Sequence, residues 1–492
     1  MSKNNDELFK NVIGHAKEYG FVFPSSEIYD GLSAVYDYGQ LGAELKNNLK
    51  TYWWKSMVQM NENIVGLDSA IFMHPKIWKA SGHVDGFADP MIDNKDSKKR
   101  YRADNLIEDK IAKYESEGKK EKAEILQQAM DAALTADDLS ALKNLIEEHQ
   151  IVCPVSGTRN WTDVRQFNLM FSTQMGAMAE GSDEVYLRPE TAQGIFVNFL
   201  NVQKSGRMKI PFGIAQIGKA FRNEVIARQF IMRMREFEQM EMQFFVRPGT
   251  EMEWYKHWKE TRLKWHLAIG TPENKYRFHD HVKLAHYANA AVDIEFEFPF
   301  GFKEVEGIHS RTDFDLSQHQ KFSGKKMQYF DNDLNQEGKP YGNYIPYVIE
   351  TSIGLDRLFL LTLCNAYEEE DLSSDERQDS RTVLHLHPAL APVKATVLPL
   401  TKKDGLPEKA RQIMDKLKYD FNMQYDEKDS IGKRYRRQDA IGTPFCITVD
   451  HQSLEDDTVT IRHRDSMKQE RVLTKDLKNI IGELVSWKNL LS

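Results

Sequence analysis

Cysteine is scarce in this chain of 492 residues, which contains only Cys153, Cys364 and Cys446. Three widely spaced cysteines cannot form a disulfide framework, and this excludes the small secreted proteins that depend on one. The sequence also lacks an apolar run of about 18 residues, and its start, MSKNNDELFK, lacks the apolar stretch of a secretory signal. These absences predict a cytoplasmic protein with no membrane partner.

An excess of positive charge is also missing, since 66 lysines and arginines face 74 aspartates and glutamates, for a net charge of −8 at pH 7. A protein that coats nucleic acid non-specifically must neutralise many phosphates, so this balance disfavours that class. Any contact with RNA is therefore expected to be local. Two basic clusters could supply it: Lys98, Lys99, Arg100 and Arg102, and Lys433, Arg434, Arg436 and Arg437. A solvated surface is the alternative interpretation of both clusters.

The length exceeds what a single hydrophobic core sustains and predicts about three modules. Hydrophobic residues make up 41% of the chain and charged residues 28%, which is typical of an ordered protein with a sizeable core. A stripe of apolar residues at helical spacing predicts a long amphipathic helix over residues 41–60. The stripe consists of Leu41, Leu45, Leu49, Trp53 and Met57. Residues 105–150, rich in Glu, Lys, Ala, Gln and Leu, predict one or more exposed helices inserted into the fold.

Two strand-like runs, FGIAQIGKAFRNE and REFEQMEMQFFV, are joined by a polar, basic loop and predict an antiparallel hairpin. If both arms are strands, Arg222 and Glu224 share one face, and Phe237, Gln239 and Glu241 share one too, because side chains alternate along a strand. Such a face suits a nucleotide: a guanidinium binds phosphate, a carboxylate binds an exocyclic amine and a ring stacks on a base. A salt-bridged hairpin surface is the alternative.

A further strand, residues 344–352, is predicted to run into a helix that starts at Gly354. Arg357 lies in the first turn of that helix, where its own charge and the helix dipole both favour an anion, although a structural ion pair explains it equally well. The acidic segment 368–382 is expected to be an exposed connection. Strand-like and helix-like runs then alternate to the end of the chain, which indicates a separate small α/β domain.

The order of these motifs resembles that of the class II aminoacyl-tRNA synthetases. FRNE at 221–224 is followed by Arg233, Phe237 and Glu241, and GLDR at 354–357 resembles the third motif of the class. The helix at 41–60 and the segment ending at Pro75 resemble the first motif, which forms the dimer interface. Four stretches resemble the homodimeric glycyl-tRNA synthetases in particular: YLRPETAQGIFVNF, GLDSAIFMHPKIWKASGH, VIETSIGLDR and IGKRYRRQDAIGTPFCITVD.

This resemblance implies an α+β fold, in which an antiparallel sheet flanked by helices carries a helical insertion and a C-terminal α/β anticodon-binding domain. The expected division is an N-terminal part of the catalytic domain with the dimer-interface motif at 1–80, an insertion that could contact the acceptor stem at 81–165, the catalytic core at 166–367, a linker at 368–384 and the anticodon-binding domain at 385–492.

The implied reaction is activation of glycine by ATP to glycyl-adenylate with release of pyrophosphate, followed by transfer of glycine to the 3′ end of tRNA(Gly). Arg222 and Arg357 are the implied catalytic residues, and Glu304 is a candidate carboxylate for magnesium. The expected ATP-binding residues are Arg222, Asn223, Glu224, Arg228, Arg233, Phe237 and Arg357. The expected glycine-binding residues are Glu190, Glu241, Arg311, Glu350 and Ser352, and the expected tRNA-binding residues are Lys98, Lys99, Arg100, Lys433, Arg434, Arg436 and Arg437.

Glycine is the smallest amino acid, so specificity is expected to come from exclusion, with Ser352 close to the α-hydrogens that a side chain would replace. Some relatives carry paired Cys-x-x-Cys elements for zinc in the insertion. The matching positions here are Asn94, Ser97, Cys153 and Ser156. One thiolate cannot hold a structural zinc, so none is expected. The remaining alternatives are another class II synthetase, such as a prolyl, seryl or threonyl one, and a non-catalytic relative that binds nucleic acid.

Overall fold

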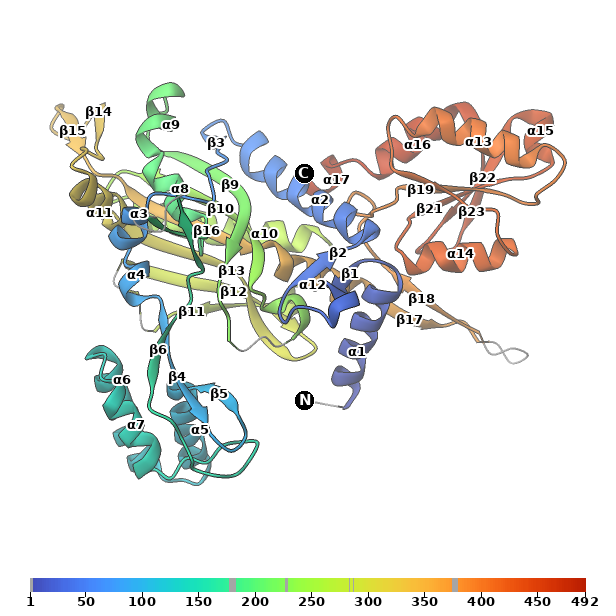
Figure 1. Ribbon diagram of the computed structural model, residues 1–492. Helices are drawn as coiled ribbons and strands as arrows, with labels where there is room; N and C mark the ends of the chain where they lie inside the picture. Colours follow the sequence, from blue (N-terminus) through green and yellow to red (C-terminus); the bar gives the residue numbers. More distant parts are fainter. Residues whose placement is uncertain (1–2, 177–182, 226–228, 283, 286, 374–378) are drawn as a thin grey trace. The chain divides into compact units, whose positions relative to one another are not determined.

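The computed structural model describes residues 3–176, 183–225, 229–282, 284–285, 287–373 and 379–492 (Figure 1). The chain divides into two compact units. The larger comprises Met1–Ala70, Glu190–Lys219 and Gln229–Ser492, and the smaller comprises Ile71–Pro189 and Ala220–Arg228. Among the described helices, none has both the length and the apolar character that crossing a bilayer requires.

A seven-stranded sheet organises the larger unit, and its pairings from β11 through β10 are antiparallel, as expected. In spatial order its strands are β11 (Tyr276–Asp280), β12 (Ala290–Phe298), β13 (Gly301–Thr312), β16 (Tyr347–Gly354), β10 (Glu236–Val246), β9 (Phe212–Phe221) and β3 (Ile64–Gly66). Strand β12 shows why the sheet has two different faces. Val292, Ile294 and Phe296 are buried in the core on one face, and the alternating Asp293 and Glu295 lie on the other.

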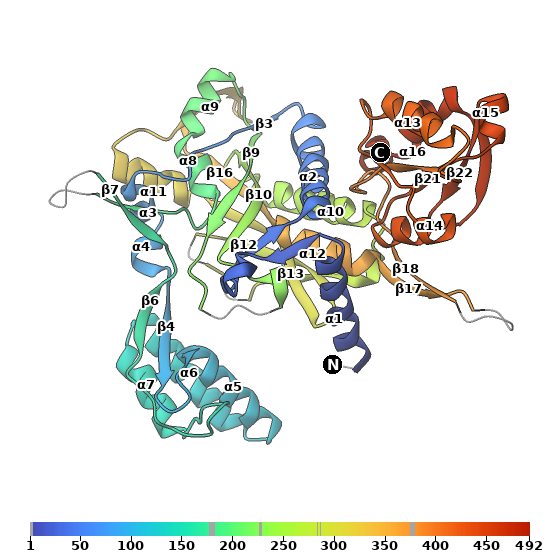
Figure 2. The same ribbon diagram turned by 45° about the vertical axis from the view of Figure 1, so that its right-hand side comes forward.

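Helices α2 (Gln40–Trp54), α10 (Glu251–Ala268) and α12 (Leu355–Ala366) supply the apolar cover of this sheet (Figure 2). The predicted stripe on α2 is buried, which confirms the amphipathic helix, and the helix continues as a π-helical turn over Lys55–Gln59. Lys46 of α2 forms ion pairs of 2.8 Å with both Glu238 of β10 and Asp356 of α12. Because Asp356 also accepts a 2.8 Å hydrogen bond from the Glu238 backbone amide, the start of α12 is fixed to the sheet.

The insertion has its own small core. Helices α5 (Ala103–Ser116), α6 (Lys120–Thr135) and α7 (Leu139–Glu148) pack together and against a three-stranded sheet. Its strands are β4 (Ala88–Asn94), β5 (Lys99–Arg102) and β6 (Arg165–Asn168). The helical part of this prediction is confirmed.

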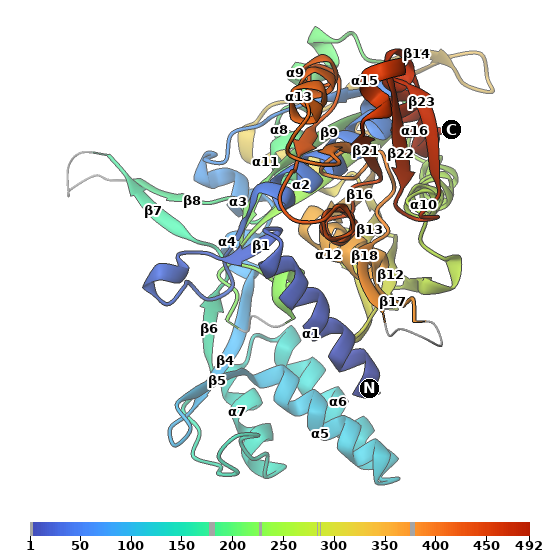
Figure 3. The same ribbon diagram turned by 90° about the vertical axis from the view of Figure 1, so that its right-hand side faces the viewer.

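The C-terminal region forms the expected α/β domain, with a five-stranded sheet and a hydrophobic cluster of its own (Figure 3). In spatial order the strands are β20 (Met423–Tyr425), β19 (Ala395–Pro399), β21 (Phe445–Val449), β22 (Thr458–His463) and β23 (Gln469–Leu473). Helices α13 (Leu406–Leu417) and α16 (Leu477–Leu484) cover one face, and α14 (Ile431–Ala440) covers the other (Figure 1).

The acidic segment before this domain contains a pair of strands that the sequence did not predict. Strands β17 (Tyr367–Asp371) and β18 (Ser380–Leu384) pair antiparallel. Buried Arg381 of β18 stabilises this pair of strands, because it forms ion pairs with Glu370 of β17 at 2.5 Å and with Asp439 of α14 at 3.2 Å. Residues 374–378 lie outside the described residues.

Candidate active site

Strand register brings sequence-distant polar residues together on the polar face of the central sheet. Glu350 of β16 lies opposite His309 of β13 and opposite Gln243 of β10. Two residues along the same strand, Ser352 lies opposite Glu241. Since residues two apart share a face, these two rows form a continuous polar patch across three strands.

Arg311 provides a guanidinium within this patch. Its Nη1 donates to Glu350 Oε2 at 3.0 Å, and its Nε donates to Asp315 Oδ2 at 2.8 Å. A second bond of 3.1 Å from Nη2 makes the pair with Asp315 bidentate, which is the arrangement in which arginine is most firmly oriented. The ring of Tyr287 lies 4.1 Å from this guanidinium. Arg311 therefore holds Glu350 and is itself held in place.

Glu190 reaches the same patch from the segment that leads into helix α8 (Ala192–Val197). Gln193 Nε2 donates to Glu190 Oε1 at 3.1 Å and to Asp315 Oδ1 at 3.0 Å. The hydroxyl of Thr191 donates to Glu241. The five residues predicted to bind glycine therefore lie in one cluster: Glu190, Glu241, Arg311, Glu350 and Ser352.

Several carboxylates of the cluster lie close enough to act on one another. Burial raises the pKa of Glu241 well above its usual range, and the carboxylates of Glu350 and Glu190 raise it further. Burial acts on Glu350 in the same way, but Arg311 and His309 outweigh it and lower the pKa of Glu350. Glu241 therefore lies among other carboxylates, and a small ligand cation between them would relieve the repulsion.

Gln243 adds a buried acceptor to this patch. Its Nε2 donates to Glu350 Oε2 at 2.7 Å and to Glu241 Oε1 at 3.2 Å, so two carboxylates fix the orientation of the amide. Its Oε1 is buried and has no hydrogen-bond partner among the described residues. A buried acceptor without a donor is costly, and a ligand with N–H groups would satisfy it.

Arg357 and Glu304, two of the residues predicted to act on ATP, form an ion pair in the larger unit. Arg357 lies in the first turn of α12, and its Nη1 is 3.0 Å from Glu304 Oε2. Its Nε also donates to the backbone oxygen of Met232 at 3.3 Å. Phe237 is half-buried at the start of β10, and Arg233 is exposed just before that strand.

The carboxylate of Glu304 fits a magnesium ion that binds ATP, because such ions take one or two protein carboxylates and complete their shell with phosphates and water. Glu304 belongs to no group of three potential metal-ligand side chains among the described residues. Phosphate oxygens would therefore supply much of the coordination.

Arg222, Asn223 and Glu224 lie in the smaller unit, and one step of the sequence argument is corrected there. Strand β9 ends at Phe221, so strand alternation does not orient Arg222 and Glu224. Arg222 Nε donates to the Pro189 backbone oxygen at 3.0 Å instead, and the Asn223 amide donates to the Leu169 oxygen at 2.8 Å.

The loop after these residues contains Arg228, the remaining predicted phosphate contact, which lies outside the described residues.

The two basic clusters differ in how much charge they expose. In the insertion, Arg100 makes a bidentate pair with Asp93 at 2.7 and 2.9 Å, whereas Lys98 and Lys99 are exposed. The pair leaves most of the positive charge of this cluster on the two lysines.

The basic residues of the C-terminal cluster lie on helix α14 and have different surroundings. Lys433 is exposed, but Arg434 is buried and donates to the backbone oxygens of Pro399 at 2.6 Å and Leu400 at 3.2 Å. Arg436 pairs with Asp379 at 3.0 Å, and Arg437 pairs with carboxylates as well. The expectation that Arg434 offers its charge to RNA is corrected, because its guanidinium is used inside the domain.

The four positions compared above with the zinc thiolates of some relatives lie close together in space. Ser97 Oγ lies 3.3 Å from Cys153 Sγ, and Ser156 Oγ donates to Asn94 Oδ1 at 3.0 Å. Burial opposes ionisation of Cys153, but hydrogen bonds with Ser156, Ser97 and Tyr101 outweigh it and lower the pKa of the thiol to about 6. Hydrogen bonds thus connect positions at which a zinc site would need thiolates.

Sequence reasoning missed several residues of the glycine cluster: Thr191, Gln193, Gln243, His309 and Asp315. Two signals could have found some of them. Gln243 lies two residues beyond Glu241 on a predicted strand, and Asp315 lies only four residues beyond Arg311, close enough in sequence for a local ion pair. Nothing in the sequence indicated Gln193 or His309, whose positions depend on the packing of α8 and on strand register.

Family models match three parts of the chain. The model described as tRNA synthetase class II core domain (G, H, P, S and T) matches residues 171–366. The model described as anticodon binding domain matches residues 394–484, and glycyl-tRNA synthetase insertion domain 1 matches residues 89–125 and 119–169.

Similar proteins span almost the whole chain. A glycine–tRNA ligase from Chlorobaculum tepidum is 55% identical over 94% of this chain and 96% of its own length. A glycine–tRNA ligase from Macrococcus caseolyticus is 52% identical over 99% of this chain and 100% of its own length. A crystal structure described as the RNA binding domain of threonyl-tRNA synthetase from Cryptosporidium parvum aligns with a TM-score of 0.60 over 96% of this chain and 97% of that one, at 15% identity. That likeness concerns the fold alone.

Proposed function

Since this chain belongs to the glycine–tRNA ligase family of class II aminoacyl-tRNA synthetases, we propose that its carboxylate cluster binds glycine for ATP-dependent activation and transfer to tRNA(Gly). The observation that carries this proposal is the charge of the cluster. Glu241 is buried, and its burial together with the carboxylates of Glu350 and Glu190 raises its pKa well above the usual range. The ammonium group of glycine is a cation small enough to lie among these carboxylates.

Ammonium binding by these carboxylates would also satisfy the buried Gln243. An ammonium has three N–H donors, and the Gln243 Oε1 atom lacks a donor among the described residues. Ser352 lies opposite Glu241 on the neighbouring strand, and we propose that its side chain limits the space beside the ammonium. We propose that this limited space excludes larger amino acids.

Activation requires no general base. A carboxylate oxygen of glycine attacks the α-phosphorus of ATP, the bond from that phosphorus to the β-phosphate bridging oxygen breaks, and pyrophosphate leaves. The protein contributes by holding the reactants in line and by stabilising negative charge. In the second step a hydroxyl of the 3′-terminal ribose of tRNA attacks the glycyl carbonyl carbon, the bond from that carbon to the phosphate oxygen breaks, AMP leaves and the hydroxyl proton is released.

We assign the nucleotide contacts as the family resemblance implies. Arg222 would contact the α-phosphate and the glycine carboxylate, Glu224 the adenine amine and Phe237 the adenine face. Arg357 would hold the outer phosphates, and Glu304 beside it would ligate the magnesium bound to them. The other proposed ATP contacts are Asn223, Arg228 and Arg233.

Outside the catalytic cluster, exposed lysines are the best supported contacts with tRNA phosphates: Lys98, Lys99 and Lys433. We further propose that the chain acts as a homodimer in the cytoplasm, where translation uses charged tRNA. Sedimentation equilibrium of the purified protein would measure the oligomeric state directly.

The test of the function is exchange of radiolabelled pyrophosphate into ATP, measured with each amino acid in turn. We expect glycine alone to support exchange. Equal exchange with proline, serine or threonine would favour another class II activity. No exchange with any amino acid, in a folded protein that binds tRNA, would favour a non-catalytic relative.

A further inference from the structure

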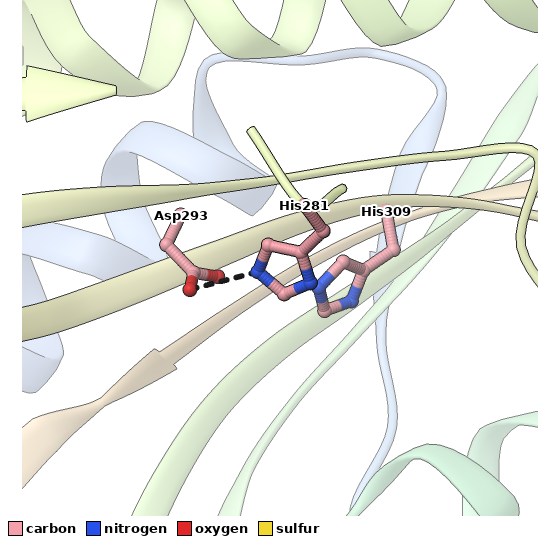
Figure 4. Close-up of side chains that lie close together, drawn as sticks. All are labelled: His281, Asp293 and His309. Carbon is pink, nitrogen blue, oxygen red and sulfur yellow. Dashed lines mark hydrogen bonds and ion pairs between the residues drawn. The ribbon is translucent and has the colours of Figure 1, made fainter. Parts of the chain in front are cut away.

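Two histidines and an aspartate converge beside the glycine cluster, on the same polar face of the sheet. Asp293 lies on β12, His309 lies on the adjacent β13, and His281 follows the end of β11 (Figure 4). Each offers one potential ligand atom, and these atoms lie within 4.8 Å of one another. His281 Nε2 is 2.9 Å from Asp293 Oδ2, and its ring lies between the carboxylate and the ring of His309.

The hydrogen bond between His309 and Glu350 leaves the other ring nitrogen of His309 available as a ligand. His309 Nδ1 lies 2.7 Å from Glu350 Oε1. A carboxylate can only accept, so Nδ1 carries the proton and donates it. In the neutral ring the lone pair is then on Nε2, and a carboxylate that fixes the tautomer in this way is the usual support of a histidine ligand.

Gly307 keeps open the space that these donor atoms face. It lies opposite Asp293 on the neighbouring strand. A Cβ atom at this position would lie 3.2 Å from His309 Nε2 and 3.7 Å from Asp293 Oδ1. Both potential ligand atoms therefore border one space, which the absence of a side chain at residue 307 leaves unfilled.

We propose that His281, Asp293 and His309 form a binding site for a divalent transition metal of the zinc class. Two imidazoles and one carboxylate are a donor set for zinc and its neighbours, whereas magnesium and calcium prefer oxygen ligands throughout. Three protein ligands leave a coordination position open, and about a third of the His281 side chain is exposed, which gives the ion a route in. Its three ligands differ from Glu304, the carboxylate proposed for the magnesium that binds ATP.

A second group of potential ligands, Glu368, Glu370 and His385, is a weaker candidate. Arg381 forms a bidentate pair with Glu370 at 2.5 and 2.9 Å, and His385 Nδ1 lies 2.6 Å from Asp465. A metal there would have to compete with a buried guanidinium. The group remains useful as a control, because it contains one histidine whose loss should not affect the proposed site.

The site is coupled to the glycine cluster through one residue. Glu350 accepts from His309 through Oε1 and from Arg311 and Gln243 through Oε2. A metal on His309 Nε2 would fix the His309 ring, and the ring would in turn orient the Glu350 carboxylate, which borders the proposed ammonium site. Loss of the Glu350 charge should weaken the metal by about 10- to 100-fold, the usual effect of removing such a supporting carboxylate.

Cobalt titration of the chelator-treated, full-length protein tests the proposal, because bound Co²⁺ absorbs visible light and Zn²⁺ displaces it. We expect about one Co²⁺ per chain, displaced by Zn²⁺ but not by Mg²⁺. His281→Ala and Asp293→Asn should each abolish this binding, and Glu350→Gln should weaken it about 10- to 100-fold. His385→Ala and Cys153→Ala, which remove ligands elsewhere, should leave it unchanged.

Gly307→Ala provides an independent test that keeps all three ligands. Its added methyl group should block the space and abolish Co²⁺ binding, with the fold checked by circular dichroism. If Co²⁺ does not bind, if it survives in both His281→Ala and Asp293→Asn, or if only His385→Ala or Cys153→Ala removes it, the proposed site is wrong. Pyrophosphate exchange does not enter this test, so failure here leaves the proposed function standing.

Discussion

The glycine cluster and helix α14 both concentrate charged residues, but they handle the charge in opposite ways. In the cluster, carboxylates from distant parts of the chain share the buried cation Arg311, and burial and neighbouring carboxylates raise the pKa of Glu241. On α14, consecutive basic residues turn to different surroundings, and Arg436 and Arg437 each find a carboxylate. The first arrangement favours a cationic ligand, and the second leaves little positive charge unpaired.

This difference shows that charges adjacent in sequence need not act together, whereas charges brought together by strand register do. A helix turns about 100° per residue, so the neighbouring Lys433 and Arg434 face different surroundings. Strands place residues two apart on one face and align them with their neighbours. Function is therefore easier to infer from the sheet than from the basic run.

The largest effect should come from removing the shared cation of the cluster. Arg311→Met leaves Glu350 and Asp315 buried without their partner, and breaking such a pair costs about 3–5 kcal/mol in the free energy of unfolding. Arg437→Met removes a half-exposed arginine paired with carboxylates, for which we expect about 0–1 kcal/mol. Urea denaturation of both variants measures the two values. Similar losses would remove the contrast drawn between the regions.

A smaller effect is expected at Glu190, and it should concern glycine alone. Glu190→Gln keeps the shape of the side chain and removes a charge-assisted hydrogen bond worth about 1.5–3 kcal/mol. The efficiency of glycine use should fall by about ten- to a hundredfold, while the KM for ATP stays nearly constant. Exchange kinetics that vary glycine and ATP separately measure both, with the exposed Glu337→Gln as the control. Normal glycine kinetics, or an equal loss for ATP, would place Glu190 outside the pocket.

Protonation of Glu241 gives a third way to sharpen the comparison. A raised pKa means that Glu241 keeps its proton in the folded protein at pH values where the unfolded chain has lost it. The contribution of this group to the free energy of unfolding is therefore complete below the usual carboxyl pKa and is lost as pH rises through the raised value. An arriving ammonium lowers that pKa, so glycine binding should release up to about one proton. Calorimetry in buffers of different ionisation enthalpy, at a mildly acidic pH, counts the protons.

Glu241→Gln is the control for that experiment, because glutamine has no proton to release. The stability of this variant should not show the decrease with rising pH that titration of Glu241 causes in the native protein. Thermal unfolding across a pH series measures this difference. If glycine binding releases no proton from the native protein, or if the variant keeps the same pH dependence, Glu241 is not the titrating group.

The sequence predicted much of the fold because its patterns are local. Leu45 and Leu49 on α2 and the alternation of Val292 and Asp293 on β12 each determine an element within a few residues. The residues proposed to bind glycine were identified by their resemblance to a family. Strand register and hydrogen bonds then showed that they lie close together. Gln193 and His309 could not be predicted, because their partners lie 122 residues away at Asp315 and 41 residues away at Glu350. The burial of Arg434 was missed for a related reason, since its partners are backbone oxygens, which the sequence does not reveal.

The smallest effect should appear on α14, where neighbouring cations are predicted to fail in different assays. Lys433→Met removes an exposed charge, so tRNA binding should weaken slightly and its logarithmic dependence on salt should flatten by about 0.7–0.9 per lost phosphate contact, with stability unchanged. Arg434→Met removes a buried donor from several backbone oxygens, so it should lower the free energy of unfolding by about 1–3 kcal/mol. If correctly folded, it should leave the salt slope unaltered. Filter binding at several salt concentrations and urea denaturation would separate the two. A change in salt slope for Arg434→Met alone would reverse the assignment and return the buried arginine to the RNA-binding surface.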